Sequence, residues 1–275
     1  CALPIWGLYR EALPVVQKVL AFFESRYGHG SHQAASSADL LAEIFRQMGN
    51  YCEAEQLLRR ALEYYEKWLG PEAKETLSSL QRLAVVLEAT GNESQAEEMY
   101  RRVKDASERV FGPEDDLTLD SSNSLAVLLH GAGRYSEAVD SYRQILSIKE
   151  RNLGPLHPET LHTLTNVAIA LTHMGNFTEG VELHRRALDA RERTLGKEHP
   201  ETLQSLSHLA LALHNMGHFP EAEELQRQAL DAKERILGPQ HPSTLRSLQR
   251  LADLLQDLGK ESEAAELQKR AAVAP

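Results

Sequence analysis

Histidine is the residue type in this sequence that is best suited to chemistry, because twelve histidines offer metal ligands and groups that titrate near neutral pH. Three of them, His157, His199 and His241, recur at intervals of 42 residues, each directly before a proline. Neighbouring packed helices lie about 8 to 10 Å apart, whereas zinc holds its nitrogen ligands at about 2.1 Å. These histidines therefore cannot share a metal ion. The sequence predicts instead that each His-Pro pair serves the turn before a helix.

Recognisable catalytic motifs are missing from the sequence. It has no CxxC pair, no HExxH, no glycine-rich phosphate loop and no GxSxG elbow. Most carboxylates stand three or four residues from an arginine or lysine, which is ordinary pairing on the surface of a helix. We therefore predict that the protein is not an enzyme, with no catalytic residue, no cofactor and no metal.

The charge, apolar content and cysteine content of the chain indicate which partners and which cellular compartment to expect. Lys and Arg number 30 against 40 Asp and Glu, the formal net charge is −10, and no basic stripe is present, so a nucleic-acid partner is disfavoured. No run approaches the ~18 apolar residues of a membrane span. Only Cys1 and Cys52 are present, which fits a reducing compartment, and we expect Cys52 to pack internally. The prediction is an intracellular protein, first of all cytoplasmic, with an organelle as the alternative.

The elements that position these side chains are repeated helix pairs. Self-similarity at a fixed period of about 20 to 50 residues is the signature of a solenoid. Here two columns of glycine keep a period of 42 residues without an insertion. The first column is Gly28, Gly70, Gly112, Gly154, Gly196 and Gly238, and the second is Gly7, Gly49, Gly91, Gly133, Gly175, Gly217 and Gly259.

Each unit contains two helices, which we call helix A and helix B. In the central unit, apolar residues from 161 to 174 fall at steps of three and four, which is helical periodicity. Pro158 suits the first turn of helix A and Gly175 its end, while helix B runs from Phe177 to the Leu195-Gly196 stop. The residues expected to be buried between the helices are Leu164, Ala168, Leu171, Gly180 and Leu183.

Small residues recur every 42 residues at one position of helix A and at one position of helix B, where the two helices must approach closely. In the central unit these residues are Ala168 and Gly180. With an aromatic residue at the head of helix B, this pattern resembles the tetratricopeptide repeat, whose usual period is about 34 residues. The longer repeat here, with LG-x-x-HP-x-T-L between units, resembles the kinesin light chain type. The resemblance runs from about Trp6 to Ala271. It implies an all-α fold, a right-handed superhelical solenoid of antiparallel helix pairs.

We predict a single solenoid over residues 1–275, because repeats bury a continuous core between neighbours. Residues 1–5 are off the pattern, and Pro4 stands where a helix interior would be disrupted. Our hypothesis is that residues 1–5 are a translated sequencing adapter and that the natural chain begins upstream, where a targeting peptide or a further domain would lie. The predicted repeats are a partial one at 6–28, then 29–70, 71–112, 113–154, 155–196, 197–238 and 239–275.

The tetratricopeptide pattern turns particular helix A positions toward a concave groove. Its lining here is mostly neutral and hydrogen-bonding, so the lysine and arginine clamp of chaperone-tail-binding relatives is absent. Of the paired asparagines of kinesin light chains only Asn123 and Asn166 remain. We expect the histidines to tighten binding of an acidic segment as pH falls toward 6. The predicted partner-binding residues are Asn123, His130, His162, Asn166, His173, His208, His214, Arg246 and Arg250.

Three functions fit these patterns. The leading prediction is a non-catalytic protein–protein interaction scaffold whose concave groove holds a protein or peptide partner, since solenoids present extended surfaces. The first alternative is a structural or assembly subunit of a large complex, for instance in an organelle. The second is the regulatory repeat region of a longer multidomain protein. In each case the partner could instead dock on the convex face, an edge or a terminus.

Overall fold

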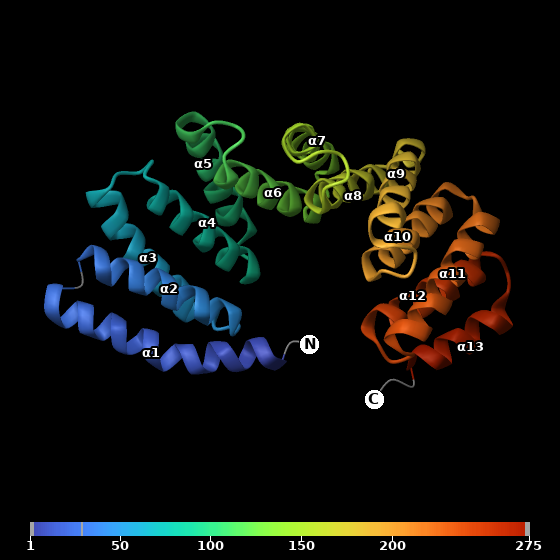
Figure 1. The fold of residues 1–275 in the computed structure, drawn as a ribbon, viewed down its shortest axis with the longest axis horizontal. Helices are drawn as coiled ribbons and strands as arrows, with labels where there is room; N and C mark the ends of the chain where they lie inside the picture. The colour runs from blue at the N-terminus through green and yellow to red at the C-terminus, as the bar shows by residue number, and fades with distance from the viewer. Residues whose placement is uncertain (1–2, 29, 273–275) are drawn as a thin grey trace. The chain divides into compact units, whose positions relative to one another are not determined.

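The computed structural model of the protein describes residues 3–28 and 30–272 (Figure 1). These residues form thirteen α-helices and, within the described ranges, no strand, so the all-α prediction is confirmed. The helices are α1 Leu3–Tyr27, α2 His32–Gln47, α3 Tyr51–Trp68, α4 Lys74–Ala89, α5 Glu93–Phe111, α6 Asp116–Gly131, α7 Tyr135–Asn152, α8 Pro158–His173, α9 Phe177–Leu195, α10 Pro200–Met216, α11 Phe219–Leu237, α12 Pro242–Asp257 and α13 Glu261–Ala272.

The helices gather into two compact units, residues 1–131 with α1 to α6 and residues 132–275 with α7 to α13. Within each unit every helix packs against the next one along the chain. The even-numbered helices, which are the A helices, also contact the next A helix: α2 meets α4, α4 meets α6, α8 meets α10 and α10 meets α12. The A helices therefore form the inner layer of each unit and the odd-numbered B helices the outer layer. The single solenoid over residues 1–275 stays a prediction.

The turns between units follow from the His-Pro pairs and the glycines. The backbone N–H of Glu159 donates to Nδ1 of His157 at 3.3 Å, which caps the start of α8. His199 and His241 cap α10 and α12 in the same way. This is the turn role that the sequence predicts for these histidines. Gly175, with φ of 88°, continues the chain after α8 in a left-handed conformation that a side chain would disfavour.

The core between α8 and α9 matches most of the predicted set. Leu164, Ala168 and Leu171 have no exposed area and Gly180 is buried, but Leu183 is only half-buried and that prediction is wrong. The reason is that the next residue of α9, His184, takes the inward position instead and is 2% exposed.

Gly180 replaces the alanine that other B helices carry at this position because Thr172 already fills the space. A Cβ on Gly180 would lie 2.6 Å from the Thr172 hydroxyl oxygen and 3.2 Å from the Ala168 carbonyl oxygen. In α3, the predicted packing of Cys52 is also wrong. Its side chain is exposed, because the buried face of that helix begins only at Ala54.

Helix α1 begins before residue 6, where the partial repeat is predicted to start. It begins at Leu3, so Pro4 falls in the first turn, where its missing N–H is not needed. Cys1 and Ala2 lie outside the described residues, and the adapter hypothesis for residues 1–5 stays a hypothesis. Among the described helices, none has the length and apolar character that crossing a membrane requires.

Ion pairs join successive B helices in the outer layer of both units. Each pair links an arginine to a glutamate 36 residues away, and the side chains are substantially exposed. Exposed pairs of this kind contribute roughly 0 to 1 kcal/mol each. Examples are Arg102 with Glu66 at 2.7 Å, Arg186 with Glu150 at 2.5 Å and Arg227 with Glu263 at 2.7 Å.

Candidate partner-binding site

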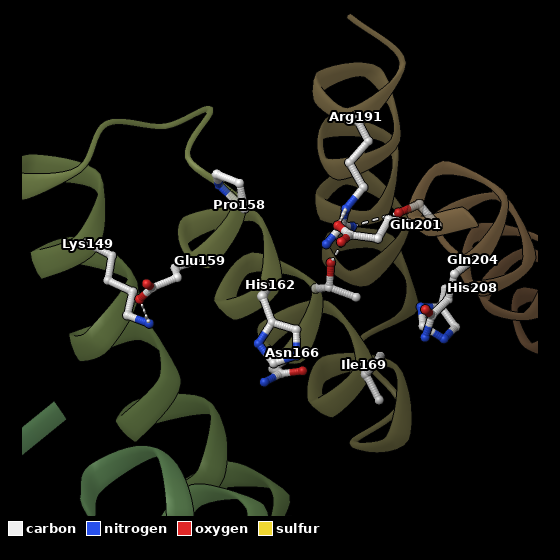
Figure 2. A pocket seen from close by; sticks show the side chains of 12 residues that line it. Lys149, Pro158, Glu159, His162, Asn166, Ile169, Arg191, Glu201, Gln204 and His208 are labelled. Carbon is white, nitrogen blue, oxygen red and sulfur yellow. Dashed lines mark hydrogen bonds and ion pairs between the residues drawn. The ribbon is translucent and has the colours of Figure 1, made fainter. Parts of the chain in front are cut away.

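A cavity of about 460 Å³ opens in the inner layer of the second unit, between α8 and α10. Figure 2 shows His162, Asn166 and Ile169 on one side of it. The B helices contribute Lys149 from the last turns of α7 and Arg191 from those of α9. The complete lining is Lys149, Pro158, Glu159, His162, Thr165, Asn166, Ile169, Arg191, Glu201, Gln204, Ser205 and His208.

Arg191 of α9 is the charged group deepest in this site, with 5% of its surface exposed. Its Nη1 donates to the hydroxyl oxygens of Thr165 on α8, at 2.9 Å, and Ser205 on α10, at 2.6 Å. Its Nε has no hydrogen-bond partner among the described residues, although a Glu201 carboxylate oxygen lies 3.5 Å away (Figure 2). Burial lowers the pKa of Arg191, yet a guanidinium is not deprotonated in proteins. The site therefore holds a buried guanidinium whose charge is partly balanced by the Glu201 carboxylate.

Arg191 is not among the predicted site residues, because the prediction is confined to positions of the A helices and Arg191 lies on helix B. A usable signal was present, since Lys149, Arg191 and Lys233 follow one another at intervals of 42 residues. Lys149 lies at the edge of the same cavity, where its Nζ donates to a Glu159 carboxylate oxygen at 3.1 Å. That hydrogen bond lowers the pKa of Glu159.

Three of the predicted partner-binding residues, His162, Asn166 and His208, come together in this cavity. Asn166 and Gln204 present amide groups from facing helices, so donors and acceptors are available on both sides. Ile169 supplies an apolar contact. The arrangement suits a peptide backbone or one polar side chain better than a flat apolar ligand.

The histidines of this site do not behave as the sequence led us to expect. Burial, and next the nearby His184, lower the pKa of His208 to about 3, and burial lowers that of His184 to about 4. The pKa of His162 is lowered as well, by burial and by the Arg191 charge. The His208 and His184 rings therefore stay neutral down to pH 6, so His208 does not supply the expected tightening of binding toward pH 6. The lowered pKa of His162 opposes that tightening as well. The Nδ1 atom of His208 is buried without a hydrogen-bond partner in the described structure.

The other predicted residues of the second unit lie apart from this cavity. His173 lines a separate cavity of about 420 Å³, where its ring packs against Tyr135 with centroids 5.6 Å apart. His214 Nε2 lies 2.6 Å from a carboxylate oxygen of Asp257. On α12, Arg246 is exposed and Arg250 half-buried.

In the first unit, Asn123 and His130 are both half-buried on α6. That they act together with Asn166 on one ligand stays a prediction. The inner layer of this unit carries a buried acid, Asp39, at the helix A position that Thr165 occupies in α8. Asp39 of α2 accepts a hydrogen bond from the Ser79 hydroxyl at 2.9 Å and pairs with Arg82, while burial raises the pKa of Asp39.

Helix pairs that repeat every 42 residues, with a polar cavity between successive inner helices, define a helical-repeat protein. Comparison with known protein families identifies the type of helical repeat. The tetratricopeptide repeat model matches residues 7–67, 35–108, 75–151, 159–235 and 206–272. The chain belongs to the tetratricopeptide repeat family.

Solved structures place the long repeat beside the kinesin light chain type. A kinesin light chain-type protein of Podosopora anserina with nearly identical TPR-like repeats is 30% identical, covers 73% of this chain and 95% of its own, and has a TM-score of 0.68. BtubC (BKLC) from P. vanneervenii is 19% identical over 85% of this chain and 94% of its own, at a TM-score of 0.69. The apo form of RapI is 14% identical over 98% and 94%, at 0.70. The last two show the fold alone. No curated protein matches the chain in sequence.

Proposed function

We propose that this protein is a non-catalytic interaction scaffold that holds a segment of a partner protein against the inner layer of its second unit. The observation that carries the proposal is the cavity between α8 and α10, which is lined by the amides of Asn166 and Gln204 and by the buried Arg191 guanidinium. Hydrogen bonds to Thr165 and Ser205 hold that guanidinium in place.

The lining groups suit recognition of an extended chain. The amides of Asn166 and Gln204 can donate to and accept from a peptide backbone, which gives affinity without strict sequence demands. Arg191 would take a carbonyl or carboxylate oxygen, and Ile169 would contact an apolar carbon. A cavity of about 460 Å³ lies at the lower end of the ~300 to 1,000 Å³ range of ligand pockets, so one side chain with its flanking backbone would fill it.

Two further features support an intracellular scaffold. The thiol of Cys52 is free and exposed, which fits a reducing compartment such as the cytoplasm. The tetratricopeptide fold itself is typical of protein–protein interaction.

The test compares partner capture by two matched variants. Asn166→Ala with Gln204→Ala removes two amides from the cavity, and Gln144→Ala with Gln228→Ala removes two exposed amides from the outer B helices. Each protein is used to capture partners from cell extract, with quantification by mass spectrometry and a thermal melt to check folding.

We expect the inner-layer variant to lose a partner that the wild type and the outer-layer control both retain. A folded inner-layer variant that captures the same proteins at the same level would contradict the proposal. Loss by the outer-layer control instead, with a stoichiometric partner that survives a salt wash, would favour a permanent subunit docked on the other face. Asn123→Ala, measured separately, tests whether α6 takes part.

A further inference from the structure

The column of buried cations continues one repeat beyond the cavity, but the acids beside it do not. Lys149 pairs with Glu159 at 3.1 Å, and Arg191 lies 3.5 Å from Glu201. The residue 42 positions after Glu201 is Ser243, so the acid is missing in the last repeat. Lys233 occupies the next position of the cation column in α11 and is 4% exposed.

Lys233 is held between two A helices by neutral groups only. Its Nζ donates to the hydroxyl oxygens of Ser207 on α10 and Ser247 on α12, both at 2.8 Å. These two bonds fix the ammonium group at the space between α10 and α12. By register, α10 and α12 are the equivalents, one repeat further on, of the two A helices α8 and α10 that border the cavity.

Two arginines add to the charge at the same place. Arg246 and Arg250 stand on α12 at the register positions that Gln204 and His208 occupy on α10, and they flank Ser247, to which Lys233 is bound. In the part of the chain that the structure describes, no carboxylate forms an ion pair with any of these three cations.

The cations also influence one another's pKa values. Burial, followed by the charges of Arg250 and Arg246, lowers the pKa of Lys233 to about 8, and burial followed by Arg246 lowers that of Arg250. This is the behaviour of like charges placed close together. An uncompensated cluster of three cations is unusual in a chain with a net charge of −10.

We propose that Lys233, Arg246 and Arg250 bind the phosphate group of a phosphorylated segment of a partner protein. A phosphate monoester carries about −1.5 to −2 charges at pH 7 and three acceptor oxygens, so it neutralises most of the cluster, whereas a carboxylate leaves about two positive charges unpaired. The planar donor forks of arginine match phosphate oxygens in pairs. Nucleic acid fits less well, because binding it requires a longer basic surface.

This inference rests on the proposed function, because the cluster belongs to the same inner layer, one repeat from the cavity. It adds the requirement that the partner segment carries a phosphate group, which the cavity alone does not demand. A partner segment bound at Asn166 and Gln204 and phosphorylated further along its chain would satisfy both sites.

The experiment uses the whole chain and three fluorescein-labelled peptides of glycine and serine. One carries a single phosphoserine, one is unphosphorylated, and one has glutamate at that position. Fluorescence anisotropy at about 50 mM salt, where charge screening is limited, gives the affinities. We expect the phosphopeptide to bind at least about tenfold more tightly than the unphosphorylated peptide, a difference of roughly 1.4 kcal/mol.

Two variants test the assignment to the cluster. Arg246→Gln with Arg250→Gln should abolish the preference for phosphate, whereas Arg185→Gln with Arg193→Gln, which removes the same charge from exposed positions of α9, should keep it. Equal binding of the phosphoserine and glutamate peptides would overturn the phosphate assignment. So would an unchanged preference in the cluster variant, or tighter binding of a labelled single-stranded DNA of equal length.

The experiments distinguish failure of the phosphate inference from failure of the proposed function. Asn166→Ala with Gln204→Ala should bind the phosphopeptide like the wild type, because neither amide belongs to the cluster. If extract capture still depends on Asn166 and Gln204 while the phosphopeptide shows no preference, only the phosphate inference is refuted.

Discussion

Gly180 is the position where a single methyl group distinguishes the packing of α8 and α9 from that of a generic repeat. We predict that Gly180→Ala destabilises the protein, although alanine is the better helix former by about 1 kcal/mol. The new Cβ would lie 2.6 Å from the Thr172 hydroxyl oxygen, which is too close for a real contact. Thr172 cannot turn away freely, because it is buried and its hydroxyl donates to the Ala168 carbonyl oxygen at 2.8 Å.

The expected magnitude comes from setting these effects against each other. Overpacking a core by one methyl group costs about 1 to 3 kcal/mol, and losing the Thr172 hydrogen bond costs about 1 kcal/mol more. After the gain of about 1 kcal/mol in helix propensity, the net loss should be about 1 to 3 kcal/mol. For a chain of this size each kcal/mol lowers Tm by about 2 to 4 °C.

The assay is a double-mutant cycle followed by circular dichroism during thermal unfolding. Thr172→Ala removes the obstructing hydroxyl, so Gly180→Ala made in that background should be neutral or slightly stabilising. The coupling between the two sites should therefore be about 1 to 3 kcal/mol, within the range for residues in contact. Gly131→Ala serves as the control, because a Cβ there meets nothing within 4 Å. A Gly180→Ala protein that melts at or above the wild type, or one that loses as much stability without the Thr172 hydroxyl, would refute this reasoning.

Three further predictions follow from the same structure. Ala168→Leu should lower the free energy of unfolding by about 1 to 3 kcal/mol through overpacking, and a wild-type melting curve would contradict the repeat register. Lys233 has a folded pKa of about 8 against an ordinary value of 10.5, so the unfolded chain binds more protons between these values. The wild type should therefore gain up to about 3 kcal/mol of stability relative to Lys233→Met as pH rises through that window; denaturant melts at pH 7, 9 and 10.5 that keep a constant difference would exclude it. Partner binding at the cavity should gain nothing from His208 between pH 8 and pH 6, because burial lowers the pKa of that ring to about 3; loss of a steep rise in affinity toward pH 6 on replacing His208 by glutamine would contradict this.

The helices and their turns could be predicted from the sequence because they depend on local rules repeated six or seven times. Pro158, Gly175 and the His157 cap act within a few residues of their own position, and the 42-residue period shows each of them again in the next unit. An error in one unit is therefore corrected by its neighbours.

The site was less predictable because it depends on contacts between units. Arg191 matters through Thr165 on one helix and Ser205 on another, and no spacing within α9 reveals that. The pKa of His208 depends on burial and on His184 of a different helix. The prediction that Leu183 is buried is wrong because helical periodicity indicates which face of a helix is buried. It does not indicate which of two adjacent residues, Leu183 or His184, lies at the centre of that face.

The outer-layer ion pairs have a mechanical consequence. The inner helices of each unit are held at their spacing by packed alanine and leucine side chains, which resist stretching and compression over fractions of an ångström. The outer helices are linked in part by exposed pairs such as Arg186 with Glu150, which are weak and are screened within about 8 Å at physiological ionic strength. We therefore expect bending of a unit to displace its outer helices more than its inner ones. A ligand gripped by the inner layer would feel little of that bending, and salt concentration would adjust the elasticity of the protein without altering the geometry that the ligand meets.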